Sequence, residues 1–75
     1  MVRGLMLIKA TYAASLDICR EASSISGVLD SYPVFGRFDA VVFIEGRGLQ
    51  ELKDVALKVA ALKGVKSTET LIEGT

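Results

Sequence analysis

An uninterrupted apolar run, AVVFI at residues 40–44, constrains the fold more than any other feature. Neighbouring side chains of a strand point to opposite faces, so a strand through this run places apolar groups on both faces of its sheet. The run LMLI at 5–8 behaves in the same way. Helices can cover one face, and a sheet-sized apolar patch rarely stays exposed. The sequence therefore predicts a second copy of the chain on the other face. The alternative is that this second face is simply partly exposed.

The periodicity of the chain predicts six elements in the order β-α-β-β-α-β. We expect strands at 5–11, 28–35, 38–45 and 65–72, a first helix capped by Ser15 and ended by Gly27, and a second helix at 49–63. Pro33 cannot donate to a strand ladder, so the second strand should lie at an edge or carry a bulge. This order is typical of the α+β ferredoxin-like fold, a four-stranded antiparallel sheet with two helices on one face.

The chain has 75 residues, which predicts a single domain over 1–75. A domain of this size buries only about 60% of the surface of its unfolded chain, so its stability is marginal without further support. The single cysteine, Cys19, excludes an internal disulfide and lies on an apolar helix stripe, which indicates an inert core thiol. The remaining sources of stability are a good core or association with a second copy.

Charge and composition exclude several classes of function. Nine basic and nine acidic residues give a formal net charge of zero, so direct binding to nucleic acid, including an RNA-binding version of this fold, is not expected. No apolar run approaches a membrane span and no signal sequence is evident, so we expect a cytoplasmic protein with no membrane contact. Without histidine and with one cysteine, we expect no metal, no cofactor and no histidine-based catalysis. The lack of asparagine and the many Lys, Glu and Val residues suggest a thermophile.

Three short motifs occur in order along the chain. They are Gly36-x-x-Asp39 at the expected hairpin, Gly64-Val65 after the second helix, and Thr68-x-Thr70 on the last strand. Together, and over nearly the whole chain, they resemble the C-terminal effector domain (RAM domain) of the Lrp/AsnC transcription regulators. The resemblance implies a dimeric α/β-barrel made by face-to-face sheets, further assembly into octamers, and amino-acid effectors bound in clefts between dimers.

Full-length members of that family carry an N-terminal helix-turn-helix domain, whereas this chain begins almost at its first strand. It therefore looks like a stand-alone RAM domain, which would sense or assemble without touching DNA and could modulate a full-length regulator. The loop 46–48 departs from the acidic, serine-rich helix start that is often seen in the family.

The resemblance implies a ligand site at Gly36, Arg37, Asp39, Thr68 and Thr70. The Asp39 carboxylate can accept bonds from the ammonium of an amino acid, while main-chain N–H groups near Gly36 and Arg37 and the two hydroxyls can bind its carboxylate. Each residue also has a structural explanation. Gly36 suits a turn, Arg37 and Asp39 suit a solvated hairpin end, and threonine is a good strand former.

Two other functions stay open. The chain can be a structural homo-oligomer that has no effector, or a small dimeric α/β-barrel enzyme. The enzyme is the less favoured of the two, because acylphosphatase chemistry needs an asparagine and this chain has none.

Overall fold

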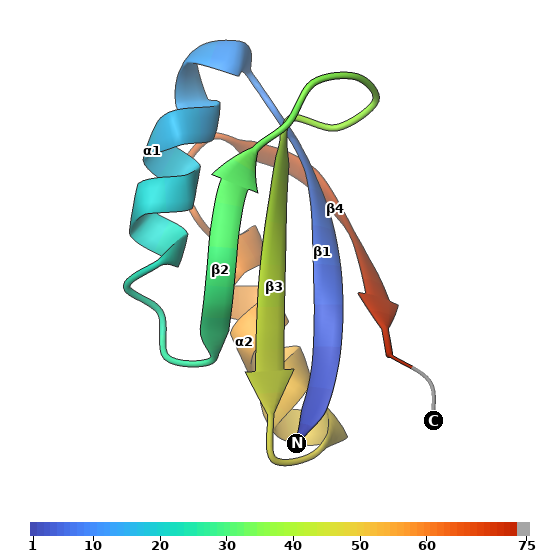
Figure 1. The fold of residues 1–75 in the computed structure, drawn as a ribbon. Helices are drawn as coiled ribbons and strands as arrows, with labels where there is room; N and C mark the ends of the chain where they lie inside the picture. The colour runs from blue at the N-terminus through green and yellow to red at the C-terminus, as the bar shows by residue number, and fades with distance from the viewer. Residues whose placement is uncertain (74–75) are drawn as a thin grey trace.

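The computed structural model describes residues 1–73, with every side chain among them except that of Tyr12. The elements in chain order are β1 (Val2–Ala10), α1 (Tyr12–Ala22), β2 (Val28–Pro33), β3 (Ala40–Gly46), α2 (Leu49–Ala60) and β4 (Val65–Ile72). The strands form one four-stranded antiparallel sheet in the order β2-β3-β1-β4. Both helices pack against the same core on one face of this sheet. In Figure 1, α2 lies behind the sheet and α1 lies to the left of β2. The predicted ferredoxin-like fold is therefore confirmed.

The start of the first helix differs from the prediction. Helix α1 begins at Tyr12, after Thr11 in extended conformation, and Ser15 is buried inside it. The prediction that Ser15 caps this helix is wrong, because β1 already ends at Ala10 and leaves only one residue before the first turn. Ala22 ends the helix, and Gly27 lies in the turn that follows, with a φ of +98° that favours glycine.

Several other boundaries are shifted. β1 begins at Val2, because its first residues pair with the end of β3, where Val2 lies opposite Gly46. β2 ends at Pro33 and β3 begins at Ala40, so residues 34–39 form a longer loop than expected. α2 ends at Ala60, and the segment 61–64 turns into β4.

The position of Pro33 agrees with the prediction. β2 is an edge strand of the sheet, and Pro33 is its last residue. The register of β2 against β3 also shifts between Val28 and Asp30, which marks a bulge. An edge position tolerates a residue that has no main-chain donor.

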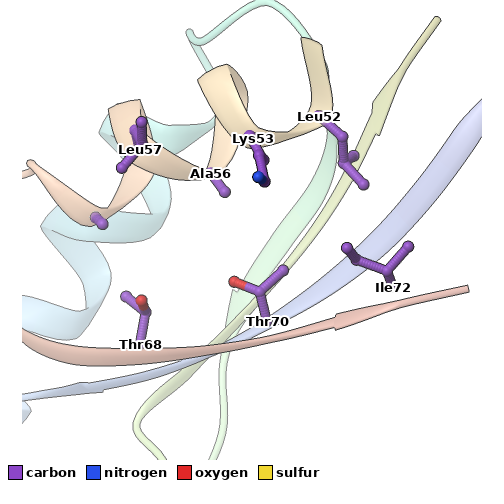
Figure 2. Close-up of a pocket in the computed structure, with 8 residues that line it drawn as sticks. Leu52, Lys53, Ala56, Leu57, Thr68, Thr70 and Ile72 are labelled. Carbon is purple, nitrogen blue, oxygen red and sulfur yellow. The ribbon is translucent and has the colours of Figure 1, made fainter. Parts of the chain in front are cut away.

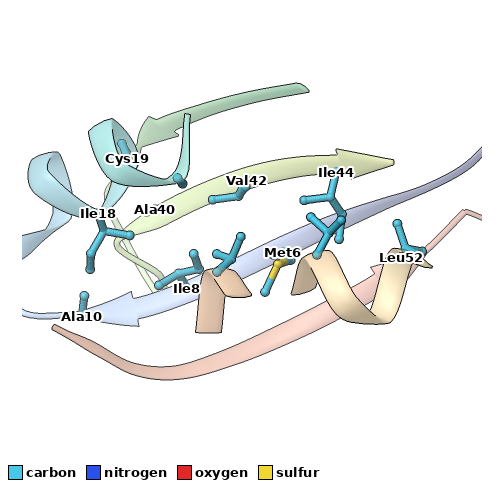
Figure 3. Packing of buried hydrophobic residues seen from close by; sticks show 12 residues of the cluster. Met6, Ile8, Ala10, Ile18, Cys19, Ala40, Val42, Ile44 and Leu52 are labelled. Carbon is cyan, nitrogen blue, oxygen red and sulfur yellow. The ribbon is translucent and has the colours of Figure 1, made fainter. Parts of the chain in front are cut away.

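The core lies between the sheet and the two helices, as Figure 3 shows. Alternate residues of the central strands point into it, and the helices supply the opposite wall. Its buried members are Met6, Ile8, Ala10, Ile18, Cys19, Ala22, Ala40, Val42, Ile44, Leu52, Val55 and Val59. The predicted alternation in β1 is confirmed, and Cys19 lies in the core. Leu16, in contrast, is 62% exposed on the outer side of α1.

The opposite face of the sheet, which we call the open face, is also apolar. Leu5 lies between Phe43 and Leu71 on the neighbouring strands, and Leu7 lies beside Val41. Tyr32 extends this surface onto β2, and its ring centroid is 6.1 Å from that of Phe43. Several of these side chains are half-buried and two, Tyr32 and Leu71, are exposed. The prediction that both faces are apolar is confirmed.

In the described part of the chain, neither helix has the length and hydropathy needed to cross a bilayer.

Candidate functional site

The loop at 34–39 joins β2 to β3 and carries three of the predicted site residues (Figure 1). Its ends are closed by a hydrogen bond from the Val34 N–H to the Asp39 carbonyl, at 3.1 Å. Gly36 has a φ of +117°, and a Cβ there would meet no heavy atom within 4 Å. The backbone conformation, rather than crowding, therefore requires glycine at this position.

Asp39 fastens this loop to the end of β1. Its main-chain N–H donates to the Ile8 carbonyl at 2.8 Å, and its carboxylate accepts a hydrogen bond from the Ala10 N–H at 2.9 Å. The side chain is half-buried, so Asp39 is not a freely solvated hairpin acid. A carboxylate has about four acceptor positions, so one bond to Ala10 is compatible with a second partner.

A pocket of about 260 Å³ lies between this loop and α1. Its walls are mainly apolar, and the Asp39 carboxylate is its one acidic group. The lining residues are Ser15, Leu16, Pro33, Val34, Phe35, Gly36 and Asp39. We call this the loop pocket. Arg37 lies in the same loop, is exposed, and does not line the loop pocket.

Thr68 and Thr70, the other two predicted site residues, lie on one face of β4 and do not line the loop pocket. They pair with Ile8 and Met6 of β1 and point toward α2 (Figure 2). They line a groove of about 370 Å³, which we call the α2–β4 groove. Its other lining residues are Leu52, Lys53, Ala56, Leu57, Ala60 and Ile72. The structure therefore brings Gly36 and Asp39 together in the loop pocket, and Thr68 and Thr70 together in the groove.

The sequence reasoning missed the apolar residues that line these two hollows. Phe35 is 87% exposed at the loop, and Leu57 is 68% exposed on α2. The sequence does hold a signal for Leu57, because it falls outside the stripe formed by Leu52, Val55 and Val59. A single exposed leucine is ordinary on a protein surface, so Leu57 becomes informative only together with the apolar residues around it.

Two ionisable groups outside these hollows have shifted pKa values. Burial raises the pKa of the Cys19 thiol, because a low dielectric disfavours the thiolate. A hydrogen bond from Arg47, with Nε 3.0 Å from the carboxylate oxygen, lowers the pKa of Glu51. Residues 1–73 contain no cluster of three or more cysteine and acidic side chains suited to a metal ion.

Comparison with known proteins finds solved structures that share the fold of this chain. No family model and no curated protein matches the sequence. Among solved structures, TTHA0845 from Thermus thermophilus matches with a TM-score of 0.91 and 26% identity, over 100% of this chain and 95% of that one. AsnC from E. coli matches with a TM-score of 0.85 and 22% identity, over 96% of this chain. The chain has an Lrp/AsnC-like fold.

The match covers 50% of the AsnC chain, so this Lrp/AsnC-like chain spans about half the length of that protein. The same fold also occurs in the siroheme decarboxylase NirDL. That match has a TM-score of 0.88 and 16% identity, and it covers 100% of this chain and 26% of NirDL. The predicted resemblance is thus confirmed at the level of the fold.

Proposed function

We propose that this protein is an amino-acid-binding and oligomerisation module of the Lrp/AsnC type. The observation that carries the proposal is the loop pocket, where one half-buried carboxylate borders an otherwise mainly apolar hollow next to a glycine turn. Such a hollow suits a ligand that has one ammonium and a small apolar side chain. The Asp39 carboxylate accepts from the ammonium, and main-chain N–H groups near Gly36 bind the ligand carboxylate.

The open face supports a homodimer. It presents Leu5, Leu7 and Phe43 on the two central strands and Tyr32 and Leu71 on the edge strands, which form one contiguous apolar surface. Charged residues such as Arg3 and Glu45 lie at its border, with the Arg3 Nε 4.0 Å from the Glu45 Oε1. A polar rim around an apolar centre is the usual anatomy of a protein interface. Two copies related by a two-fold axis bury this surface against itself and add stability to a small domain.

Assembly beyond the dimer and contact with a full-length regulator belong to the same proposal. The support is the fold that this chain shares with about half of the AsnC chain. The loop 34–39 lies at the end of the sheet, where it joins β2 to β3 (Figure 1). Since the loop pocket is lined by residues of this loop, a second dimer can close over it there.

An enzyme is the second candidate, favoured only by the fold shared with NirDL. The composition argues against it, because the chain has no histidine and its cysteine lies in the core with a raised thiol pKa. We therefore propose a binding module without catalytic activity.

Light scattering with and without a mixture of the common amino acids tests assembly and ligand response together. We expect a dimer or larger species whose size or melting temperature changes with one amino acid. A ligand at 100 times its Kd adds about 2.7 kcal/mol of stability. No change in size or melting temperature at millimolar concentration of any amino acid would overturn the binding proposal and leave a structural homo-oligomer.

A further inference from the structure

The α2–β4 groove lies on the helix side of the sheet, opposite the open face (Figure 2). It remains accessible when two open faces meet, and it is lined by different residues from the loop pocket. Its shape follows from how α2 sits on the sheet. Leu52, Val55 and Val59 anchor the helix in the core, so the side of α2 that overhangs β4 is a separate stripe.

That stripe consists of Lys53, Ala56, Leu57 and Ala60, which share one face of the helix at spacings of three and four residues. The two alanines leave room that larger side chains would fill. Leu57 is 68% exposed and Ile72, on the opposite wall, is 48% exposed. The apolar walls of the groove are therefore exposed to solvent in the free protein, and a ligand that buries them gains free energy from the hydrophobic effect.

The floor of the groove carries hydroxyl groups where the neighbouring strand carries core residues. Met6 and Ile8 of β1 are 1% and 0% exposed, yet their partners on β4 are Thr70 and Thr68. Figure 2 shows both threonine side chains rising from β4 toward α2. Each hydroxyl can donate and accept a hydrogen bond, so the floor offers two polar groups within a mainly apolar groove.

Lys53 supplies the single charge among the lining residues. It takes no part in the ion pairs found within residues 1–73, and its ammonium lies on the α2 side of the groove (Figure 2). No carboxylate lines the groove. Charge complementarity thus selects an anion, and it disfavours an amino acid, whose ammonium would find no carboxylate and would face Lys53.

We propose that the α2–β4 groove binds an amphipathic monocarboxylate. The ligand carboxylate meets the Lys53 ammonium and the hydroxyls of Thr68 and Thr70, and its apolar chain lies along Ala56 and Ile72. The volume of about 370 Å³ is within the range of small-molecule sites, which combine apolar walls with a few polar groups. This site is independent of the amino-acid site proposed at the loop pocket.

Nuclear magnetic resonance with octanoate and octylamine tests the proposal, because the two probes share a chain length and differ in charge. We expect octanoate, well below its micelle concentration, to shift the amide signals of 52–60 and 68–72 in a saturable way. Octylamine should not do so. The loop 34–39 should be unaffected, so the result is read separately from any amino-acid response.

Three substitutions sharpen the test. Ala56→Leu fills the groove and should abolish saturable octanoate binding. Lys53→Gln removes the charge at an exposed position and should weaken binding about two- to fivefold. Lys58→Gln, on the same helix but outside the groove lining, is the matched control and should leave octanoate binding unchanged.

Four results would overturn the proposal. They are an absence of saturable shifts with octanoate, equal shifts with octylamine, unchanged octanoate binding by a folded Ala56→Leu variant, and shifts of the groove amides that depend on protein concentration alone. The last result would mean that a second copy of the chain occupies the groove.

Discussion

The carboxylate of Asp39 accepts a hydrogen bond of 2.9 Å from the main-chain N–H of Ala10, and so ties the hairpin loop to the end of β1. Replacement by alanine leaves this partly buried N–H without its partner. We expect Asp39→Ala to lower the free energy of unfolding by about 1–3 kcal/mol in urea denaturation. Asp39→Asn keeps an acceptor oxygen, so its loss of unfolding free energy should be less than half of the loss in Asp39→Ala. Equal losses in the two variants would argue against the hydrogen bond.

The same pair of variants separates the structural role of Asp39 from a binding role. Asp39→Asn removes the charge but keeps the loop in place, so it should abolish the response to an amino acid if the carboxylate accepts the ammonium. Neither variant should affect the proposed dimer, because the open face is untouched. Calorimetric titration measures the affinity. Unchanged affinity in Asp39→Asn would assign Asp39 a structural role alone.

The open face gives a prediction about assembly. Leu7→Lys places a charge at its centre, between Val41 and Glu69 on the neighbouring strands. The monomer can still solvate this ammonium, but a sheet-to-sheet dimer must bury it, so we expect the dimer to dissociate. Leu49→Lys is the matched control, because Leu49 is 52% exposed at the start of α2. Light scattering should report a smaller species for Leu7→Lys alone.

Gly27 and Gly36 are required for different reasons. Gly27 has a φ of +98°, and a Cβ there would lie 2.5 Å from Cγ2 of Val55, whereas Gly36 has a φ of +117° and open space around it. Gly36→Ala should therefore lose about 1–2 kcal/mol from backbone strain alone. Gly27→Ala adds a steric overlap and should lose more. Urea denaturation of both variants checks the order, and equal losses would show that Val55 moves aside.

Cys19 gives a prediction about reactivity and pH. The thiolate is the reactive form, and burial raises the pKa of this thiol, so a thiol reagent at pH 8 should modify Cys19 only when the protein unfolds. The rate should rise with urea in step with unfolding. The folded state favours the neutral thiol, because burial raises the thiol pKa there. The contribution of the neutral thiol to the free energy of unfolding is therefore fully present below the pKa of the unfolded thiol. That stability is lost as the pH rises toward the folded value.

A Cys19→Ala variant is the control for this pH dependence. Its free energy of unfolding should fall less at alkaline pH than that of the unmodified protein, because it has no thiol to ionise. Rapid modification of the native protein at pH 8 would contradict the buried position of Cys19.

Much of the architecture was readable from local patterns. The alternation of Met6 and Ile8 with Leu5 and Leu7 identified the two faces of β1, and the whole of β4 was predicted with its observed bounds. Pro33 marked an edge strand because proline lacks a main-chain donor. These features follow from covalent chemistry and from the two-residue period of a strand, which act within a few residues of the chain.

The helix start and the grouping of the site residues depended on tertiary structure. Ser15 has the chemistry of an N-cap, but the early end of β1 places it inside α1 and buries it. Asp39 and Thr68 both lie beside Ile8 on β1, yet they line different hollows. The reason is that α1 borders the loop while α2 overhangs β4. Which helix lies over which strand is decided by long-range packing, which spacing along the chain cannot encode.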